Sequence, residues 1–510
     1  MNVSLDTTTG ISKKIIAALQ KWPFYVLLLP LFFVLHGLRE NFGFIMPRDA
    51  ASLWLFYTGA IGILYLLLLF FYRKHQKTGL LTLLLSAFFF FFGAIQDFLK
   101  WTIPQLNRYV ILFPLFFFVV IITIVVLKRT AKDFRKLSLY LNLLLLLLSA
   151  YDFFVIAYYT MFPEKDKISI YPFAENKDYT ICRDCDRPDI YFLLFDEYTS
   201  SESLKNSLGF DNSGLDSFLT NRNFRILKNS SGNYHHTPFS MASILNMSYI
   251  NGLDSRQIDL NDFARCIKLV RENKVIKFLS ANGYDVVNYS IFDLAGNPSP
   301  LNQDLLPLKT KLITDRTLWG RMRSQILWNL FTGRFEVELL TKNLIYIHLT
   351  NNNQLFDLVK QECLKKNDKP RFIYVHFNMP HRPYYFDRNG KLKDREKIKN
   401  DYTNEGYLDN VVYTNKKLEE LVTHIQDNSH GNAAIIIMGD HGYRLDTTLP
   451  QKVFFENQNA VYLPKKNYQL FYDSMSGVNQ FRVIFNSLFK QNFPLLKDST
   501  TFLKQVNKEP

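Results

Sequence analysis

Five apolar stretches in the first third of the chain constrain its fold more than any other feature. Each approaches the roughly 20 residues that an α-helix needs to cross a bilayer. Soluble domains do not string so many such runs together, and no small-residue cleavage site marks a signal peptide. We therefore predict a transmembrane region of about five helices over residues 1–162. The stretches are Tyr25–Leu38 (which contains Pro30 and His36 and can begin as early as Ile15), Leu53–Tyr72, Leu80–Leu99, Tyr109–Leu127 and Leu137–Tyr159.

Lysine and arginine in the short loops predict the orientation of these helices, because cytoplasmic loops are richer in both residues. The loops before the first stretch, after the second and after the fourth are basic, whereas the alternate loops hold few such residues. The amino terminus is therefore expected in the cytoplasm, and five crossings place the chain after about Met161 outside. The richer loops carry Lys13, Lys14 and Lys21; Arg73, Lys74 and Lys77; and Lys128, Arg129, Lys132, Arg135 and Lys136.

Charge by itself could indicate a nucleic-acid partner, since the formal net charge of the 510 residues is +14. Many of the basic residues flank apolar runs, however, where they fix membrane orientation. We therefore expect no nucleic-acid partner. After the membrane region, residues 163–187 are polar and weakly patterned and indicate a linker, 188–496 have globular composition, and 497–510 form a tail.

Four cysteines are too few for a disulfide framework in a chain of this length. Cys182 and Cys185 form a Cys-Arg-Asp-Cys motif in the predicted linker. In an oxidising compartment we favour a local disulfide over a zinc site, because no second Cys or His pair follows at zinc spacing. Cys266 and Cys363 could pair with each other or stay free.

Three buried strands are predicted in the globular part, and each runs into potential ligands. Ala434–Gly439 is small and β-branched, as in the middle of a parallel sheet, and ends on Asp440–His441. Asp189–Phe195 ends on Asp196–Glu197 in the same way, and Phe372–Phe377 leads into Met379–Tyr384. Amphipathic helices alternate with these strands, which predicts an α/β domain with a largely parallel central sheet.

The turn Asp440–His441–Gly442 offers one oxygen and one nitrogen ligand for a divalent metal. It lies at the carboxyl end of its strand, where open α/β sheets build their sites. The alternative is an ordinary strand that ends in a polar turn.

Four segments in this order resemble the sulfatase/alkaline-phosphatase superfamily. They are the strand ending at Asp196–Glu197, the segment around Thr237, Pro380–His381–Arg382–Pro383, and Asp440–His441–Gly442. Behind five predicted spans, the chain is most similar to membrane enzymes such as lipoteichoic acid synthase and the lipid A phosphoethanolamine transferases. This resemblance implies an extracytoplasmic catalytic domain anchored in a bacterial-type inner (cytoplasmic) membrane.

The nucleophile segment departs from the pattern of true sulfatases. Those enzymes carry Cys or Ser, followed by Pro and Arg two and four positions later, and oxidise the first residue to formylglycine. Here Thr237 holds the first position, while Phe239 and Met241 replace the Pro and the Arg. Threonine cannot become formylglycine, so the resemblance favours transferases and phosphodiesterases that use a plain Thr. Ser240 is the competing nucleophile.

Apolar residues after Thr237 predict a helix, with Pro238 at its first position and backbone N–H groups available to a phosphate. A Thr that only caps this helix is the alternative without catalysis.

The resemblance implies that Asp196, Thr237, Asp440 and His441 bind one divalent cation. This oxygen-rich set with one imidazole suits Zn²⁺ or Mn²⁺. His381 would contact the phosphate or protonate the leaving oxygen, unless it is a loop histidine. The same resemblance makes Glu197 a ligand or a supporting group, and Arg444 either binds phosphate or lies on the surface. His235 and His236 could line the site, whereas His376 is interpreted as a satisfied core residue.

These inferences predict a membrane-anchored phosphotransferase. It would move a phospho-head-group from a membrane phospholipid, through Thr237, to an envelope glycan or lipid. A hydrolase of phosphate or sulfate esters is the first alternative, and a non-catalytic sulfatase-like membrane protein is the second. The sequence does not distinguish phosphoglycerol from phosphoethanolamine as the head group.

Overall fold

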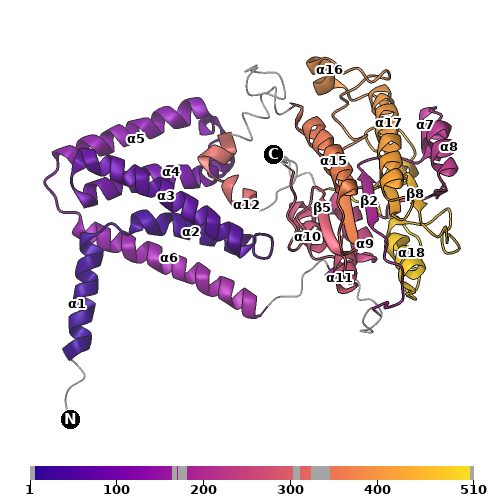
Figure 1. Cartoon of the computed structure of the whole chain (residues 1–510). Coiled ribbons are helices and arrows are strands. Elements are labelled where there is room, and N and C mark those ends of the chain that lie inside the picture. Colours follow the sequence, from indigo (N-terminus) through magenta and orange to yellow (C-terminus); the bar gives the residue numbers. More distant parts are fainter. Residues whose placement is uncertain (1–5, 163–168, 171–180, 302–309, 323–344, 506–510) are drawn as a thin grey trace, which may run out of the picture. The chain divides into compact units, whose positions relative to one another are not determined.

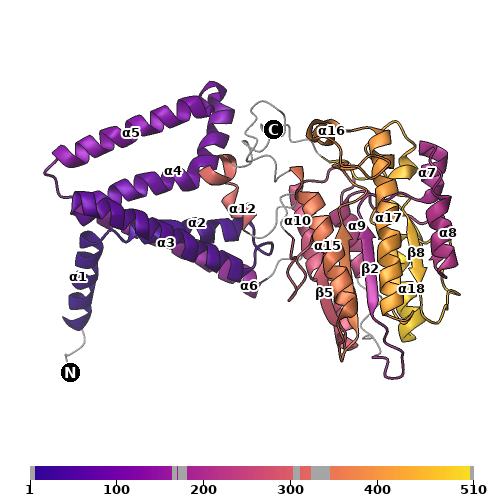
Figure 2. The ribbon, with the colours of Figure 1, turned by 45° about the horizontal axis from the view of Figure 1, so that its top comes forward.

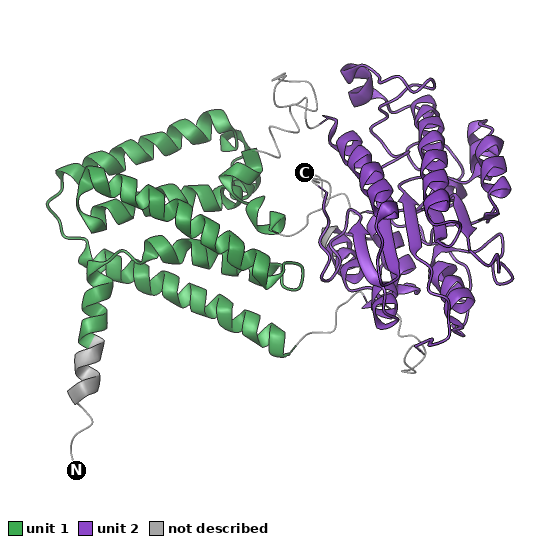
Figure 3. Cartoon of the chain, in the orientation of Figure 1, with its two compact units in different colours: residues 1–165, 306–336 green, residues 166–305, 337–510 purple. Residues whose placement is uncertain are grey.

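The computed structural model describes residues 6–162, 169–170, 181–301, 310–322 and 345–505. The chain forms two compact units, which Figure 3 shows in different colours. Unit 1 combines residues 1–165 with residues 306–336, and unit 2 combines residues 166–305 with residues 337–510. A segment that follows the first part of the globular sequence thus belongs with the amino-terminal helices.

Unit 1 contains the apolar helices predicted from the sequence (Figure 1). Four of them are long and apolar enough to cross a membrane. The first predicted span is different, because it is a pair of helices bent by 91°, and it makes a fifth span only if the pair is counted as one. The helices are α1 (Asp6–Lys21), α2 (Tyr25–Glu40), α3 (Pro47–Tyr72), α4 (His75–Thr102), α5 (Tyr109–Arg129) and α6 (Arg135–Met161).

One buried side-chain amide on α6, that of Asn142, forms hydrogen bonds with the backbone groups at the bend between α1 and α2. Asn142 Oδ1 accepts a hydrogen bond from the Tyr25 backbone N–H at 2.6 Å. Its Nδ2 donates to the carbonyl oxygens of Leu19 and Trp22, at 2.7 and 2.8 Å. A helix break in an apolar surrounding needs such partners for its freed backbone groups. This side chain therefore allows the first predicted span to bend.

Unit 1 also holds a short segment from the middle of the sequence, which includes α12 (Lys311–Thr314). Ile313 is buried in the same apolar cluster as residues of α2 and α4. The Gly93 N–H donates to the Arg316 carbonyl at 2.9 Å, and Arg321 pairs with Asp97 at 2.7 Å. Asp97 needed no functional interpretation in the sequence, and here it anchors this segment.

Unit 2 is built on a six-stranded sheet in the order β3-β8-β7-β2-β6-β5. The pairs β7–β2, β2–β6 and β6–β5 are parallel, whereas β8 runs antiparallel to both of its neighbours. The predicted largely parallel sheet is therefore confirmed, with an antiparallel edge. The strands are β2 (Ile190–Phe195), β3 (Arg225–Ile226), β5 (Asp285–Tyr289), β6 (Arg371–Phe377), β7 (Ala434–Gly439) and β8 (Asn459–Tyr462); β1 (Ser169–Ile170) and β4 (Ile250–Asn251) pair separately.

Register decides which face of the sheet each side chain occupies, because successive residues of a strand point to opposite faces. Leu194 of β2 pairs with His376 on one side and with Met438 on the other. These three side chains therefore share a face, and Asp196 and Asp440, two residues beyond Leu194 and Met438, continue it. The opposite face carries Tyr191, Leu193, Phe195, Ile373, Val375, Phe377, Ile435 and Ile437, which all belong to one buried apolar cluster.

Amphipathic helices cover the two faces. One of them is α17, whose Leu418, Leu421, Val422 and Ile425 belong to the same apolar cluster. It runs beside α15, as Figure 2 shows. On the other face, Phe481 of α18 packs edge-on against Phe192, with ring centroids 5.1 Å apart. The helices are α7 (Ser201–Leu208), α8 (Ser213–Asn221), α9 (Thr237–Asn246), α10 (Leu260–Arg271), α11 (Lys274–Ala281), α15 (Ile347–Leu364), α16 (Arg395–Asn400), α17 (Asn404–Asn428) and α18 (Gly477–Phe489).

The cysteines follow the sequence prediction where it was definite. Cys182 and Cys185 form the local disulfide. Cys266 and Cys363, for which two possibilities were open, are both free.

Candidate metal centre

The carboxyl edge of the sheet brings two carboxylates and an imidazole together. Phe195 pairs with Gly439 at the ends of β2 and β7, so the next residue of each strand leaves the sheet at the same place. Asp196, Asp440 and His441 are buried there, and each offers one ligand atom within 4.8 Å of the others. This is the arrangement expected where parallel strands end side by side.

The atoms that face one another are the ones that lack other partners. Asp196 Oδ1 and Asp440 Oδ2 lie 3.8 and 3.3 Å from His441 Nε2, and neither oxygen has a hydrogen-bond partner among the described residues. Asp440 Oδ1, in contrast, accepts from the Glu197 N–H at 3.0 Å. His441 Nδ1 lies 2.9 Å from the Gly442 carbonyl, so it carries the proton and leaves the Nε2 lone pair free. Two buried oxygens and one nitrogen fit a divalent cation such as Zn²⁺ or Mn²⁺.

Electrostatics at this edge also favour a cation. Burial and then the charge of Asp196 raise the pKa of Asp440 to about 7. Burial, followed by the charge of Arg444, holds the pKa of His441 well below its ordinary value, so its imidazole stays neutral and able to bind a metal. Two carboxylates that cannot both ionise easily in a buried site are relieved when a cation neutralises them.

Thr237 reaches the same point from the first residue of α9. Its Oγ1 lies 3.4 Å from His441 Nε2. The competing Ser240 is fully buried, and its hydroxyl donates to the Asp440 carbonyl at 2.6 Å. The predicted helix is present, although Pro238 occupies its second position and not the first. Of the two hydroxyls, that of Thr237 faces the carboxylate pair, while that of Ser240 supports the backbone.

The turn after β7 tolerates no larger residue at Gly442. A Cβ atom there would meet the carbonyl oxygens of Val453 and Glu456. This close packing fixes the backbone that presents Asp440 and His441.

Glu197, Arg444 and His381 form a second group beside the first. Glu197 Oε1 accepts from the Arg444 backbone N–H at 3.1 Å, and the Arg444 Nε lies 3.8 Å away. His381 donates its backbone N–H to the Asp196 carbonyl, and its Nδ1 lies 2.7 Å from the Arg382 carbonyl. Its Nε2 is 3.9 Å from Glu197 Oε2. Burial lowers the pKa of His381, but the Asp196 and Glu197 carboxylates outweigh this effect and raise it.

The two histidines before Thr237 hold Arg444 in place. Arg444 Nη1 donates to the His235 carbonyl at 2.5 Å and to His236 Nδ1 at 2.8 Å. Burial and then Arg444 lower the pKa of both imidazoles, so both stay neutral. The His235 ring stacks on Phe502 of the tail, with centroids 4.4 Å apart and planes at 11°.

The sulfatase family model matches residues 218–498, which is more than half of the chain. The chain belongs to the sulfatase family. The matched region contains Thr237, His381, Asp440 and His441, whereas Asp196 precedes it.

Several solved structures with related folds are distantly similar to this sulfatase-family chain. They include the C-terminal periplasmic domain of phosphoethanolamine transferase EptC from Campylobacter jejuni (15% identity, 64% of this chain and 98% of that one, TM-score 0.35). The zinc complex of the periplasmic domain of EptC from Escherichia coli (12%, 63% and 87%, 0.37) and the phosphonate monoester hydrolase of Agrobacterium radiobacter (13%, 59% and 74%, 0.37) are also similar. No curated protein matches significantly. These likenesses are too distant to carry an argument about substrate or mechanism.

Two histidines of the sulfatase domain lie near the site although the sequence did not point to them. His376 was interpreted as a satisfied core residue, but its buried Nε2 has no hydrogen-bond partner among the described residues and lies 3.5 Å from Asp196 Oδ2. His348 on α15 was not singled out. Burial and then His381 lower its pKa to about 4. The two-residue period of β6 could have placed His376 on the face of Asp196.

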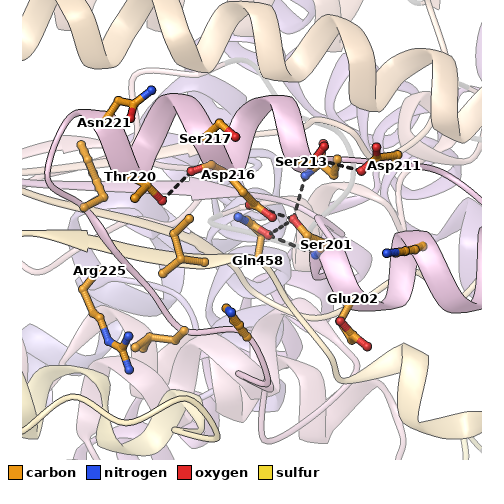
Figure 4. Close-up of a pocket in the computed structure, with 16 residues that line it drawn as sticks. Ser201, Glu202, Asp211, Ser213, Asp216, Ser217, Thr220, Asn221, Arg225 and Gln458 are labelled. Carbon is orange, nitrogen blue, oxygen red and sulfur yellow. Dashed lines mark hydrogen bonds between the residues drawn. The ribbon is translucent and has the colours of Figure 1, made fainter.

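A separate cavity of about 740 Å³ opens between α7, α8 and β3 of the sulfatase domain (Figure 4). Its lining is mostly polar, and the Ser201 hydroxyl joins Asp216 at 2.9 Å within it. None of the seven predicted site residues lines this cavity.

Proposed function

We propose that this protein is a membrane-anchored, metal-dependent phosphotransferase. It takes a phospho-head-group from a membrane phospholipid onto Thr237 and passes it to a hydroxyl of an envelope glycan or lipid. One observation carries the proposal: the Thr237 hydroxyl lies beside His441 Nε2, which Asp196 Oδ1 and Asp440 Oδ2 also face, and neither oxygen has a hydrogen-bond partner in the described part of the chain.

The residues suit this reaction in their types and positions. Asp196, Thr237, Asp440 and His441 would hold the cation. When bound, it lowers the pKa of the Thr237 hydroxyl and neutralises charge on the phosphate.

The Thr237 hydroxyl first loses its proton to water, and its Oγ1 then forms a bond to phosphorus while the bond from phosphorus to the lipid oxygen breaks. His381 would give the proton from its Nε2 to that leaving oxygen, so that the lipid departs as an alcohol. A hydroxyl of the acceptor then attacks phosphorus and releases Thr237, and its own proton restores His381.

Arg444 and Glu197 support the substrate side. The Arg444 guanidinium is held by the His235 carbonyl and the His236 ring, so one edge of the planar group is fixed. A phosphate oxygen can accept from its remaining N–H groups. Glu197 orients Arg444 through the backbone N–H and lies within 3.9 Å of His381.

The membrane helices support a lipid as the donor. A site tethered to the bilayer meets lipid head groups at high effective concentration. The basic loops favour an inner-membrane protein with a cytoplasmic amino terminus, so that the catalytic domain and its acceptor are extracytoplasmic.

Intact-mass spectrometry of the full chain in detergent tests this function. The protein is incubated with mixed phospholipids and Mn²⁺ or Zn²⁺, and we expect an added phospho-head-group that maps to Thr237 and disappears when acceptor is supplied. The mass of the adduct identifies the head group and therefore the donor phospholipid. Ester hydrolysis without an adduct would favour the hydrolase instead. Absence of adduct, hydrolysis and bound metal would leave a non-catalytic protein.

A further inference from the structure

His376 is the buried titratable group at the site to which the proposed reaction assigns no task. It lies in β6, its side chain is fully buried, and its Nε2 has no hydrogen-bond partner among the described residues. A polar atom buried in this way costs free energy unless a neighbour compensates. Its surroundings therefore indicate what the histidine does.

Geometry connects His376 to one oxygen of Asp196. His376 Nε2 is 3.5 Å from Asp196 Oδ2, whereas the other oxygen, Oδ1, lies 3.8 Å from His441 Nε2. The two oxygens of this carboxylate thus face two different imidazoles. Only Oδ1 belongs to the atoms that converge with Asp440 Oδ2 on His441.

The other ring nitrogen of His376 faces a hydroxyl. Tyr374 Oη lies 3.3 Å from His376 Nδ1, on the same strand and the same face of the sheet. A phenol donates its proton to an imidazole lone pair, which assigns the remaining ring proton to Nε2. His376 is then a donor aimed at Asp196 Oδ2.

We propose that His376 is a positioning residue for the metal centre: its Nε2–H holds Asp196 Oδ2, and so turns Oδ1 toward His441 and the cation. Partners of this kind orient a metal ligand without touching the metal. The inference rests on the proposed function, because it assumes that Asp196 is a ligand.

Metal affinity of the full-length protein tests the inference, with Zn²⁺ or Mn²⁺ alone as the probe. Removing the donor in His376→Leu should weaken metal binding about tenfold or more. His376→Gln can place an amide N–H near the position of Nε2 and should bind within about threefold of wild type. His424→Gln is the matched control: the Nε2 of this α17 histidine lies 3.2 Å from the Lys360 carbonyl, and its substitution should leave metal affinity unchanged.

A second variant covers the case in which His376→Leu fails to fold. His376→Asn keeps a polar group, but its side chain is too short to reach Asp196, so it should weaken binding as Leu does. Equal metal binding by wild type, Leu and Asn variants would overturn the inference alone. Two ions per chain in wild type and one in His376→Leu would make His376 a ligand, which also overturns it. A wild-type protein that binds no metal would overturn the proposed function as well.

Discussion

Two ends of the same sheet bury charge in opposite ways. At the amino ends of the strands, Arg371 pairs with Asp189 at 2.6 Å and with Glu362 at 2.9 Å, and it also donates to the Glu362 carbonyl. At the carboxyl ends, Asp196 and Asp440 lie beside each other, and one oxygen of each has no hydrogen-bond partner among the described residues.

The difference separates a structural network from a functional site. Where a guanidinium already satisfies the buried carboxylates, nothing further is needed and the network fixes the fold. Where two carboxylates and a neutral imidazole converge, and no Lys or Arg of the described residues lies between them, the site suits a bound cation. The following four predictions test this contrast, from the largest expected effect to the smallest.

Thr237→Ala should lower phosphotransfer about 10⁴-fold or more, because it removes the proposed nucleophile. The unfolding temperature should change little, since the substitution removes one hydroxyl and one methyl group from the first turn of α9 and alanine is a good helix former. Transfer of a labelled head group measures the activity. Ser240→Ala is the control and should keep most of the transfer activity. An inactive Ser240→Ala variant together with a fully active Thr237→Ala variant would make Ser240 the nucleophile.

Arg371→Leu should destabilise unit 2 by about 3 kcal/mol, because it removes the guanidinium that pairs with the buried Glu362 and the partly exposed Asp189. Calorimetry in detergent measures the shift. Metal affinity of the protein that remains folded should equal that of wild type, since Arg371 lies at the far end of the strand from Asp196. A change in metal affinity with no loss of stability would break the contrast between the two edges.

Asp→Asn substitutions should change the free energy of unfolding in opposite directions at the two edges of the sheet. In metal-free protein, Asp440→Asn should stabilise by about 1 kcal/mol, because it removes a buried charge that lies beside the Asp196 carboxylate, while Asp189→Asn should destabilise by about 1–3 kcal/mol. Saturating metal should stabilise wild type and Asp189→Asn but not Asp440→Asn. Thermal unfolding with and without chelator measures the stability of each variant and its stabilisation by metal. If both substitutions stabilised or both destabilised the metal-free protein, the interpretation would be contradicted.

Phe502→Ala should lower transfer a few-fold, because it removes a stacked aromatic pair worth about 1 kcal/mol from His235, which helps to hold Arg444. Steady-state kinetics should show the change mainly in KM. Leu495→Ala, a change at an exposed residue seven positions earlier in the chain, is the control. Identical kinetics for both variants would limit the site to the strand ends and α9.

Much of the fold could be predicted because its signals are local. Asp189–Phe195 and Ala434–Gly439 are continuous apolar runs of strand length, and both are central parallel strands in the structure. The four apolar runs from Leu53 onward are each long enough to be helices by composition alone. The first span was less simple, because Asn142, more than a hundred residues away, satisfies the break that bends it.

The sequence by itself therefore determined the membrane helices, the alternating α/β domain and the residue types at the strand ends. Only the tertiary structure decided which of those residues meet. Register between β2, β6 and β7 puts His376 beside Asp196, and the packing of α9 turns Thr237 rather than Ser240 toward His441. It also assigned residues 306–336 to unit 1. The physical reason is that apolar periodicity depends on residues that are close in the sequence, whereas register and packing depend on contacts between residues that are far apart in it.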